Sequence, residues 1–457
     1  MPTRLTAAIL HPRLERVLAR PAGTGWVLPV VELAARTWHG DHRPLGEALA
    51  SALYGAAPTA VPVLLRRLAE VDEGPEGVRE LAMLAELAPA GEDPPAGWKW
   101  IDAKAAAALD TPWARAAAEL ALASGTDGVP ALRPPWARER TGWHAALLRW
   151  TDDALAAAGR RRQTALEPVK VWSLAAVYRA GTDAGTVYVK AATPAQPLFV
   201  DEATLTAALA ERWPDRLPRV LAARPGDGWL LMADEGQPVW ALPDLTDPQR
   251  RELAIAAARA HARLQVASVP AVADLLAAGC IDRRLPVLID QLGPLLDDPL
   301  TAAYVAPERL DQLRLAQPTI RAALDRLAAL DVPPAIVHGD LHLGNTLLRD
   351  GEPVFIDWTD ACIGPAMMDL LTPHETKDLE LAAGWRDAYL QEWSTLVPRA
   401  MLDDALALND IVLPLHHAVS YRSILANLEP IERGDLAGAL TELLGLLGDA
   451  AGLAQKR

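Results

Sequence analysis

Apolar and polar residues alternate differently along the 457-residue chain, and the changes divide it into three blocks. Residues 1–127 mix short apolar runs, typical of strands, with stretches in which apolar residues recur every three or four positions, typical of helices. This pattern predicts a small α/β domain. Its expected strands are 5–10, 25–31 and 61–65, and its expected helices are 43–54 and 113–123.

A segment rich in Gly and Pro follows at 125–136 and is predicted to be a linker. The second block, residues 136–238, has the pattern of a β-rich unit. The turn 181–185, with Gly at both ends, is typical of a hairpin. The expected strands are 169–180, 186–191, 219–223 and 228–233, and the expected helices are 142–158 and 202–211.

The third block, residues 239–455, is predicted to be mostly helical. Helical periodicity is clear at 252–265, 307–330 and 379–393. One β-rich island, residues 335–356, interrupts the helices, and its apolar runs predict a β-hairpin. The chain as a whole is therefore expected to have an α+β fold.

The island carries the polar groups with the clearest chemistry. Its first apolar run ends at His338-Gly339-Asp340, Asn345 follows five residues after Asp340, and its second run ends at Asp357. Phosphoryl transfer from ATP needs a carboxylate that orients and deprotonates an acceptor hydroxyl, and oxygen ligands for Mg²⁺. Asp340 suits the first task, and Asn345 with Asp357 suits the second. Protein kinases have the same spacing of four residues between Asp and Asn.

The string His338-Gly-Asp-Leu-His-Leu-Gly-Asn345, followed by Ile356-Asp-Trp358, Gly364-Pro365 and Asp369, resembles the aminoglycoside phosphotransferase and choline kinase superfamily. The resemblance implies a bilobal protein-kinase-like fold, with a small β-rich N-lobe at 136–238 and a helical C-lobe at 239–455. It implies ATP and Mg²⁺ as cofactors. Asp340 would be the catalytic base, Asn345 and Asp357 would hold the metal, and His338 and Asp369 would be structural. His342 is interpreted as packing in the loop, with substrate contact as the alternative.

The resemblance also assigns residues of the second block. Lys190, at the end of an alternating strand, would bind the α- and β-phosphates, and Glu202, at the start of a helix, would hold that lysine. Backbone groups around Met232 and Asp234 would meet the adenine. No Gly-rich loop precedes Lys190, so the groups that cover the phosphates stay unassigned, with Ser173 as a candidate.

In this superfamily the acceptor is held by the helical C-terminal part. The candidate stretch here is 415–423, in which His417 and Tyr421 lie four residues apart on one helix face, followed by Arg422. A core helix whose polar groups bond to neighbours is an equally good interpretation. Asp360 and Glu375 are further candidates. The acceptor class stays open among aminoglycosides, sugars and amino alcohols, because fold does not fix function.

The first block resembles a Nudix-type domain in residues 5–33 and 95–102, but it lacks the acids of a hydrolase. Glu47 is the single acid in the helix at 43–54, whereas such hydrolases use clustered carboxylates to bind divalent ions. The block is therefore expected to be a catalytically inactive Nudix-like domain.

Composition narrows the possible partners. The net charge of −15 disfavours nucleic acid, and no apolar stretch approaches the length of a membrane span. The two cysteines, Cys280 and Cys362, match no metal spacing and are expected to be reduced thiols. These features together favour a cytoplasmic protein that acts on a small molecule, with no membrane partner and no indication of oligomeric state.

Two other functions fit the fold expected for this chain. A non-catalytic nucleotide-binding protein is disfavoured because Asp340, Asn345 and Asp357 are all present. A kinase that acts on protein side chains or glycated amines is the other alternative, although the Asp-Phe-Gly and Ala-Pro-Glu strings of protein kinases are absent.

Overall fold

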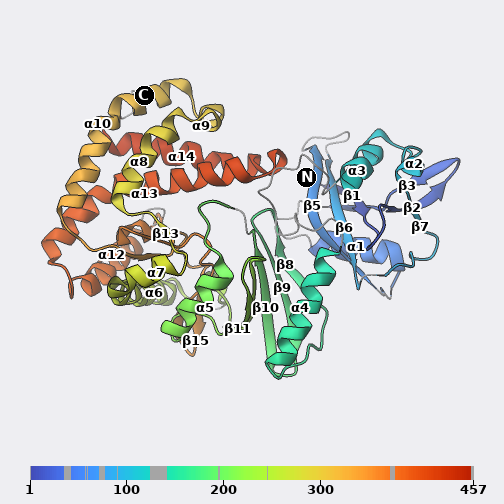
Figure 1. Cartoon of the computed structure of the whole chain (residues 1–457), viewed down its shortest axis with the longest axis horizontal. Coiled ribbons are helices and arrows are strands. Elements are labelled where there is room, and N and C mark those ends of the chain that lie inside the picture. The colour runs from blue at the N-terminus through green and yellow to red at the C-terminus, as the bar shows by residue number, and fades with distance from the viewer. Residues whose placement is uncertain are drawn as a thin grey trace. The chain divides into compact units, whose positions relative to one another are not determined.

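The computed structural model describes residues 2–34, 43–56, 58, 60–71, 78–89, 91–123, 142–193, 196–243, 245–370 and 376–453. The chain forms two compact units (Figure 1). Unit 1 contains Met1–Ala195, Asp227–Met232 and Leu428–Glu432, and unit 2 contains Gln196–Gly226, Ala233–Asn427 and Arg433–Arg457. The linker expected at 125–136 lies entirely outside the described residues, and the domain bounds 1–127, 136–238 and 239–455 stay a prediction.

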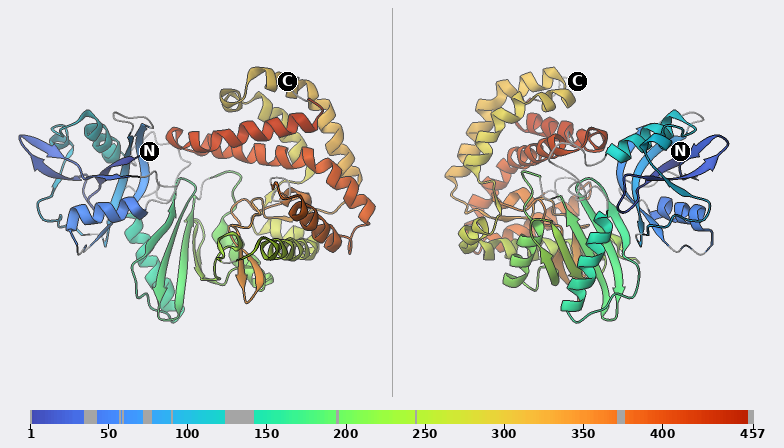
Figure 2. Two further views of the ribbon diagram at one scale, coloured as in Figure 1. Left: turned by 180° about the vertical axis from the view of Figure 1, so that it is seen from behind. Right: turned by 45° about the vertical axis from the view of Figure 1, so that its right-hand side comes forward.

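The first sheet of unit 1 has the strand order β4-β1-β6-β5. Strands β1 and β6 run parallel, whereas β1–β4 and β5–β6 are antiparallel. Side chains alternate between its faces, so that Leu5 and Ile9 pack with helix α1 and Ala8 packs with helix α3. The ribbon views show these two helices on opposite faces of the sheet (Figure 2). The elements are β1 (Thr3–Ile9), β4 (Val30–Leu33), α1 (Arg43–Tyr54), β5 (Val61–Val71), β6 (Arg79–Ala88) and α3 (Pro112–Ala123).

The alternation of apolar residues did not predict β6. Its sequence RELAMLAELA is rich in residues that favour helices, but the strand is buried on both faces between β1 and β5. The expected strand 25–31 is two strands, β3 (Gly25–Val27) and β4. Strand β3 belongs to a small sheet in the order β3-β2-β7, in which β2 is Val17–Ala22 and β7 is Lys99–Ile101. A short helix, α2 (Ala103–Ala106), follows β7.

Another set of strands in unit 1 lies in the order β12-β10-β9-β8, in which the pairs β10–β9 and β9–β8 are antiparallel. The hairpin expected at 181–185 is confirmed, because Gly185 on β10 pairs with Thr182 on β9. The run 169–180, expected as one strand, is two, since the chain turns between β8 and β9. These elements are α4 (Trp143–Ala157), β8 (Glu167–Val171), β9 (Ala175–Thr182), β10 (Gly185–Ala192) and β12 (Trp229–Ala233), and unit 1 also holds η5 (Pro430–Glu432).

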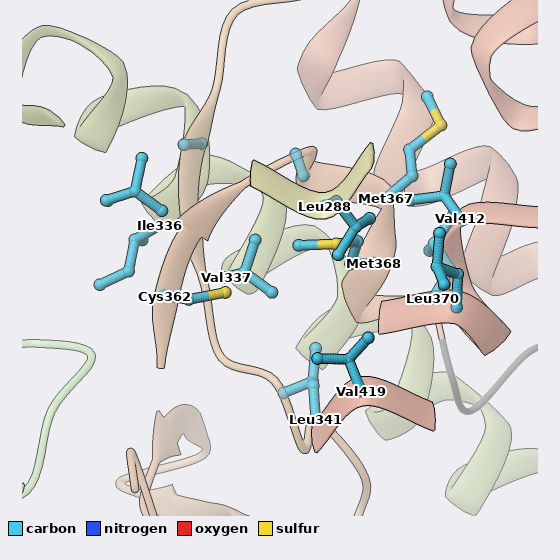
Figure 3. Packing of buried hydrophobic residues seen from close by; sticks show 14 of the residues in the cluster. Leu288, Ile336, Val337, Leu341, Cys362, Met367, Met368, Leu370, Val412 and Val419 are labelled. Carbon is cyan, nitrogen blue, oxygen red and sulfur yellow. The ribbon is translucent and has the colours of Figure 1, made fainter. Parts of the chain in front are cut away.

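Unit 2 is mostly helical, as the periodicity predicts. One hydrophobic cluster forms its core, and Figure 3 shows part of it around Val337, Leu341 and Met368. Figure 1 shows α14 running along α13, and these two helices pack against each other. The helices are α5 (Glu202–Arg212), α6 (Asp247–Ser268), α7 (Val272–Ala277), α8 (Leu285–Asp297), α9 (Pro299–Tyr304), α10 (Pro307–Ala329), α12 (Leu379–Trp393), α13 (Arg399–Asn427) and α14 (Gly434–Ala450), with 3-10 turns η2 (Val239–Ala241), η3 (Val269–Ala271) and η4 (Ala366–Asp369).

The β-rich island does not form one hairpin, and this corrects the expectation for residues 335–356. Strands β15 and β16 pair as a hairpin, but β14 belongs to a different sheet in the order β13-β17-β14. The strands of unit 2 are β11 (Val220–Arg224), β13 (Ile281–Asp282), β14 (Ala335–Val337), β15 (Thr346–Arg349), β16 (Glu352–Phe355) and β17 (Cys362–Gly364).

Cys280 and Cys362 are both buried thiols that form no disulfide. Among the described helices, none has the length and apolarity needed to cross a bilayer.

Candidate active site

The segment between β14 and β15 forms a loop whose backbone is fixed by a buried histidine. His338 Nε2 lies 2.9 Å from the carbonyl oxygen of Ile356, and this acceptor requires the proton on Nε2. Nδ1 is then left to accept the backbone N–H of Asp340 at 3.4 Å. Burial lowers the pKa of His338, which keeps the ring neutral. The histidine therefore links the Asp340 loop to the end of β16.

Asp340 and Asn345 are brought together by the loop. Asn345 Nδ2 donates to the backbone oxygen of Asp340 at 2.9 Å and to its Oδ2 at 3.1 Å. The Asp340 side chain is 45% exposed, so an acceptor molecule can reach it. His342 Nε2 lies 3.6 Å from Asp340 Oδ2, and its Nδ1 accepts the Gly344 N–H at 2.9 Å. His342 thus both braces the loop and approaches the carboxylate.

Asp357 follows β16 in a backbone conformation unusual for a residue with a side chain. Its φ of 65° lies in the left-handed region, which is favourable mainly for glycine. Glu202 holds the residues that follow, because its carboxylate accepts the Trp358 N–H at 3.1 Å and lies 2.9 Å from the Thr359 hydroxyl. Such strained residues gather at functional sites, where surrounding contacts hold them in place.

The Thr359 hydroxyl connects two carboxylates. Its oxygen lies 2.9 Å from Glu202 Oε2 and 2.9 Å from Asp357 Oδ1. A hydroxyl has a single proton and can donate to only one of them at a time. The carboxylates of Glu202 and Asp357 therefore lie on either side of the same hydroxyl, which ties Asp357 to the start of α5.

Asp369, at the end of η4, holds the start of the loop. Its carboxylate accepts the backbone N–H groups of His338 at 2.8 Å and Gly339 at 2.9 Å. The side chains of Gln265 and His261 also donate to it, at 2.9 and 2.7 Å. Burial by itself would raise the pKa of Asp369, but His261 and these hydrogen bonds outweigh it and lower the pKa. Asp369 is therefore an ionised buried anchor for the backbone just before Asp340.

The sequence analysis missed the residues that support Asp369. His261 and Gln265 lie one turn apart on α6, and both are fully buried. Tyr389 and Trp393, one turn apart on α12, both donate to Gln265 Oε1. In the sequence, these supporting residues could have been recognised as polar residues that lie four positions apart on helix faces that are otherwise apolar.

The oxygen donors of the site suit Mg²⁺. Because the Asn345 amide nitrogen faces Asp340, its oxygen is the atom left for a cation, and Asp357 supplies a carboxylate. Mg²⁺ is usually held by one or two such groups and keeps several waters. Within the described ranges, no group of three or more His, Cys, Asp or Glu residues could hold a metal ion. One amide oxygen and one carboxylate make a donor set of the size that Mg²⁺ accepts.

The nucleotide-binding candidates lie on both units. In unit 1, Lys190 is buried on β10 and Met232 is half-buried on β12. In unit 2, Asp234 follows β12, and its carboxylate accepts the Gly236 N–H at 2.9 Å. The backbone oxygen of Asp234 already accepts from Arg219, at 3.3 Å. Ser173 is buried in unit 1.

The acceptor candidates on α13 differ in their surroundings. His417 is 5% exposed and Tyr421 is half-buried on the same helix face. Arg422 forms an ion pair with Asp298, the residue that caps α9, so its charge is engaged in the helical fold. On the same helix, the backbone carbonyl oxygen of His416 accepts a hydrogen bond from the buried side chain of Arg283 at 2.9 Å.

Asp360 lies against the loop that carries Asp340. A Cβ atom at Gly339 would come within 2.4 Å of the Asp360 backbone oxygen, which shows how closely the two segments pack. Glu375 lies outside the described residues.

Comparisons with known proteins assign the chain to a family. The sequence profile of the phosphotransferase enzyme family matches residues 166–402, just over half of the chain. No curated protein matches the chain. The chain is similar to a macrolide 2'-phosphotransferase from Brachybacterium faecium, with 18% identity over 64% of this chain and 97% of that chain and a TM-score of 0.43. It is similar to a choline/ethanolamine kinase family protein from Mesorhizobium loti, with 18% identity over 67% of this chain and 100% of that chain and a TM-score of 0.43. It is also similar to an aminoglycoside phosphotransferase, APH(2")-IIa, in a ternary complex with streptomycin and ATP, with 14% identity over 67% of this chain and 98% of that chain and a TM-score of 0.45. The match to residues 166–402 covers the whole loop around Asp340, and the chain belongs to the phosphotransferase enzyme family.

Proposed function

We propose that the chain transfers the γ-phosphoryl group of ATP to a hydroxyl group of a small molecule. The observation that carries the proposal is the contact between Asn345 and Asp340, which orients a half-exposed carboxylate and turns the amide oxygen away from it. A base and a metal ligand are thereby set side by side, as phosphoryl transfer requires.

Asp340 is the proposed base. Its carboxylate would accept the proton of the acceptor hydroxyl as that oxygen bonds to the γ-phosphorus and the bond to the ADP oxygen breaks. Its orientation is fixed by Asn345 Nδ2 at 3.1 Å and by the anchoring of the loop through Asp369. The protein's main contribution is position, since phosphoryl transfer needs little covalent chemistry from the enzyme.

Asn345 and Asp357 are the proposed ligands of Mg²⁺. When bound, the ion would neutralise the charge on the β- and γ-phosphates. Besides its proposed contact with Lys190, Glu202 would stabilise the metal site, because its carboxylate accepts the Trp358 N–H and so stabilises the strained turn at Asp357.

The remaining nucleotide contacts are assigned from the resemblance to the N-lobe of the phosphotransferase family. Lys190 would bind the α- and β-phosphates, and backbone groups around Met232 and Asp234 would meet the adenine. The backbone oxygen of Asp234 already accepts from Arg219, so the neighbouring backbone groups are the better candidates for the base. ATP is present in the solved aminoglycoside phosphotransferase complex to which the chain is similar.

The acceptor would bind near Asp340, with Asp360, His417 and Tyr421 as the proposed contacts. Arg422 is the weakest candidate, because its guanidinium pairs with Asp298. Sugars, amino alcohols and aminoglycosides remain the acceptor classes to screen, and the small molecule is the proposed partner of a cytoplasmic enzyme.

Calorimetric titration with ATP, with and without Mg²⁺, tests the proposal first. We expect binding that depends on Mg²⁺, followed by ADP release when a suitable acceptor is added. Mg²⁺-dependent binding without turnover on any acceptor class would favour the non-catalytic alternative. Absence of ATP binding in both conditions would contradict the proposal.

A further inference from the structure

A cavity of about 230 Å³ lies in unit 2, and its lining residues come from segments other than the loop that carries Asp340. Its walls come from the start of α8, the end of α10 with the residues that follow, the segment from β17 into η4, and α13. Most of the lining is apolar, including Leu285, Leu327, Val332 and Met367. Drug-sized ligands occupy cavities of about 300–1,000 Å³, so this cavity suits a smaller molecule.

One polar side chain in the lining has no hydrogen-bond partner for its oxygen. Asn409 on α13 is 6% exposed, and within the described part of the chain nothing donates to its Oδ1. A buried amide in apolar surroundings is destabilising unless a partner satisfies it. Oδ1 has less than 1 Å² of accessible surface as the side chain now stands. Rotation about the last side-chain bond exchanges the oxygen and nitrogen, so the amide can turn either atom toward a group that both donates and accepts. A hydroxyl is such a group.

The charged residues at the rim do not favour an ionic ligand. Arg284 donates to both carboxylate oxygens of Asp282, at 2.9 and 2.6 Å, so its charge is balanced locally. Asp331 lies on the exposed edge. An ion would lose its hydration against the apolar walls without gaining an opposite charge inside the cavity. The occupant is therefore expected to be neutral.

We propose that this cavity is a binding site for a small neutral alcohol that consists of an apolar ring or short chain and one hydroxyl. The apolar part would pack on Leu327 and Met367, and the hydroxyl would pair with the Asn409 amide. An apolar cavity of about 150 Å³ accommodates benzene, so the larger volume here leaves room for a ring and a short arm.

The site is close to the machinery of the proposed function. Its wall includes Ala366 and Met367, which belong to η4, and the same turn ends at Asp369, the anchor of the catalytic loop. The Ala366 carbonyl accepts from Gln265, which also donates to Asp369. An occupant would thus contact the turn that positions the loop. The binding proposal itself does not rest on catalysis.

Methionine methyl groups report binding without any activity. The full chain has six methionines, so a sample labelled with ¹³C at these methyls gives few signals. The probes are benzyl alcohol and toluene, which share the ring but differ in the hydroxyl. We expect benzyl alcohol to shift the Met367 signal saturably, with a smaller shift at buried Met368 and none at Met83 in unit 1. The Met367→Leu variant assigns the signal.

Two variants identify the site and the role of the amide. Asn409→Leu should weaken benzyl alcohol binding about fivefold, the usual effect of one neutral hydrogen bond, and leave toluene binding unchanged. Ala405→Phe should fill the cavity and abolish the Met367 shift from both probes, since Ala405 also lines it. Unchanged Met83 and Met368 signals would show that each variant is folded.

Three results would overturn the proposal. The first is a Met367 signal that neither probe moves, which would mean that the cavity holds water only. The second is equal affinity of benzyl alcohol for wild type and Asn409→Leu. The third is binding that survives in Ala405→Phe. None of these depends on ATP turnover, so failure here is separate from failure of the proposed phosphotransfer.

Discussion

Asn345 Nδ2 lies 3.1 Å from Asp340 Oδ2 and 2.9 Å from the Asp340 carbonyl oxygen. This double contact orients the carboxylate of the proposed base and leaves the amide oxygen of Asn345 facing away from it. The Asn345 side chain therefore orients the proposed base and is itself a proposed ligand of Mg²⁺.

Replacing Asp340 should separate catalysis from nucleotide binding. We expect Asp340→Asn to lower turnover about 10²–10⁴-fold, the usual contribution of a general base, while ATP affinity stays within a few-fold. Steady-state assays and calorimetry measure the two effects. Asp325→Asn, at an exposed position of α10, is the control and should change neither. Loss of ATP binding in Asp340→Asn would contradict the role of base.

Asp357 should carry the metal dependence. We expect Asp357→Ala to bind ATP equally well with and without Mg²⁺, because a carboxylate ligand of the ion is gone. Calorimetry over a range of Mg²⁺ concentrations measures this, with Asp325→Ala as the control. A variant that retains the wild-type Mg²⁺ dependence would show that the ion is held elsewhere.

Asp369 should matter for stability as well as for turnover. Asp369→Asn keeps the shape of the side chain but replaces one carboxylate oxygen by an NH₂ group. That group cannot accept the hydrogen bonds that His338, Gly339, Gln265 and His261 donate to the carboxylate. We expect a loss of about 3 kcal/mol in the free energy of unfolding, as is usual when a buried charged hydrogen-bond network is broken. Urea unfolding measures it. Asp378→Asn is the comparison, because this partly exposed cap of α12 keeps a capping oxygen when it becomes an amide and should cost much less.

Gly339 and Gly351 form a matched pair that separates backbone strain from steric conflict. Their φ values are 84° and 85°, but a Cβ at Gly339 would lie 2.4 Å from the Asp360 oxygen, whereas one at Gly351 would meet nothing within 4 Å. We expect Gly351→Ala to cost about 1–2 kcal/mol from the left-handed conformation alone. Gly339→Ala should cost more and should abolish turnover. Equal thermal shifts for the two variants would contradict this.

His144 should make stability fall in acid. Burial first, and then Arg162, lower the pKa of this buried ring from 6.5 to about 4. Between these values the unfolded chain binds a proton that the folded chain does not, so stability is complete above pH 6.5 and falls as the pH drops. The slope from this group is about 1.4 kcal/mol per pH unit, or about 3 kcal/mol in total.

The variant His144→Phe isolates that contribution. The ring shape is kept, so the variant should lose the part of the acid destabilisation that His144 causes, while at pH 8 its stability should stay close to that of wild type. Urea unfolding at pH 8, 6 and 5, followed by tryptophan fluorescence, gives the difference. A constant difference between the two proteins at all three values would show that His144 does not titrate in this range.

Much of the fold follows from local sequence. The helix at 43–54 was predicted with the bounds that α1 has, and the hairpin between β9 and β10 follows from its two glycines. Strand β6 could not be predicted in this way. Its Leu, Ala, Met and Glu residues favour a helix, and only burial between β1 and β5 makes it a strand.

The sequence by itself determined the chemistry of the proposed site. Asp340 and Asn345 lie five residues apart on one loop, and Asp357 follows a short hairpin, so local geometry is enough to place them near each other. Tertiary structure alone decided what holds them. Glu202 supports the turn after Asp357 from 156 residues away, and His261 meets Asp369 across 108 residues. Such contacts depend on how helices and sheets pack, and hydrophobic periodicity shows which face of an element is buried but not which polar group it will meet there.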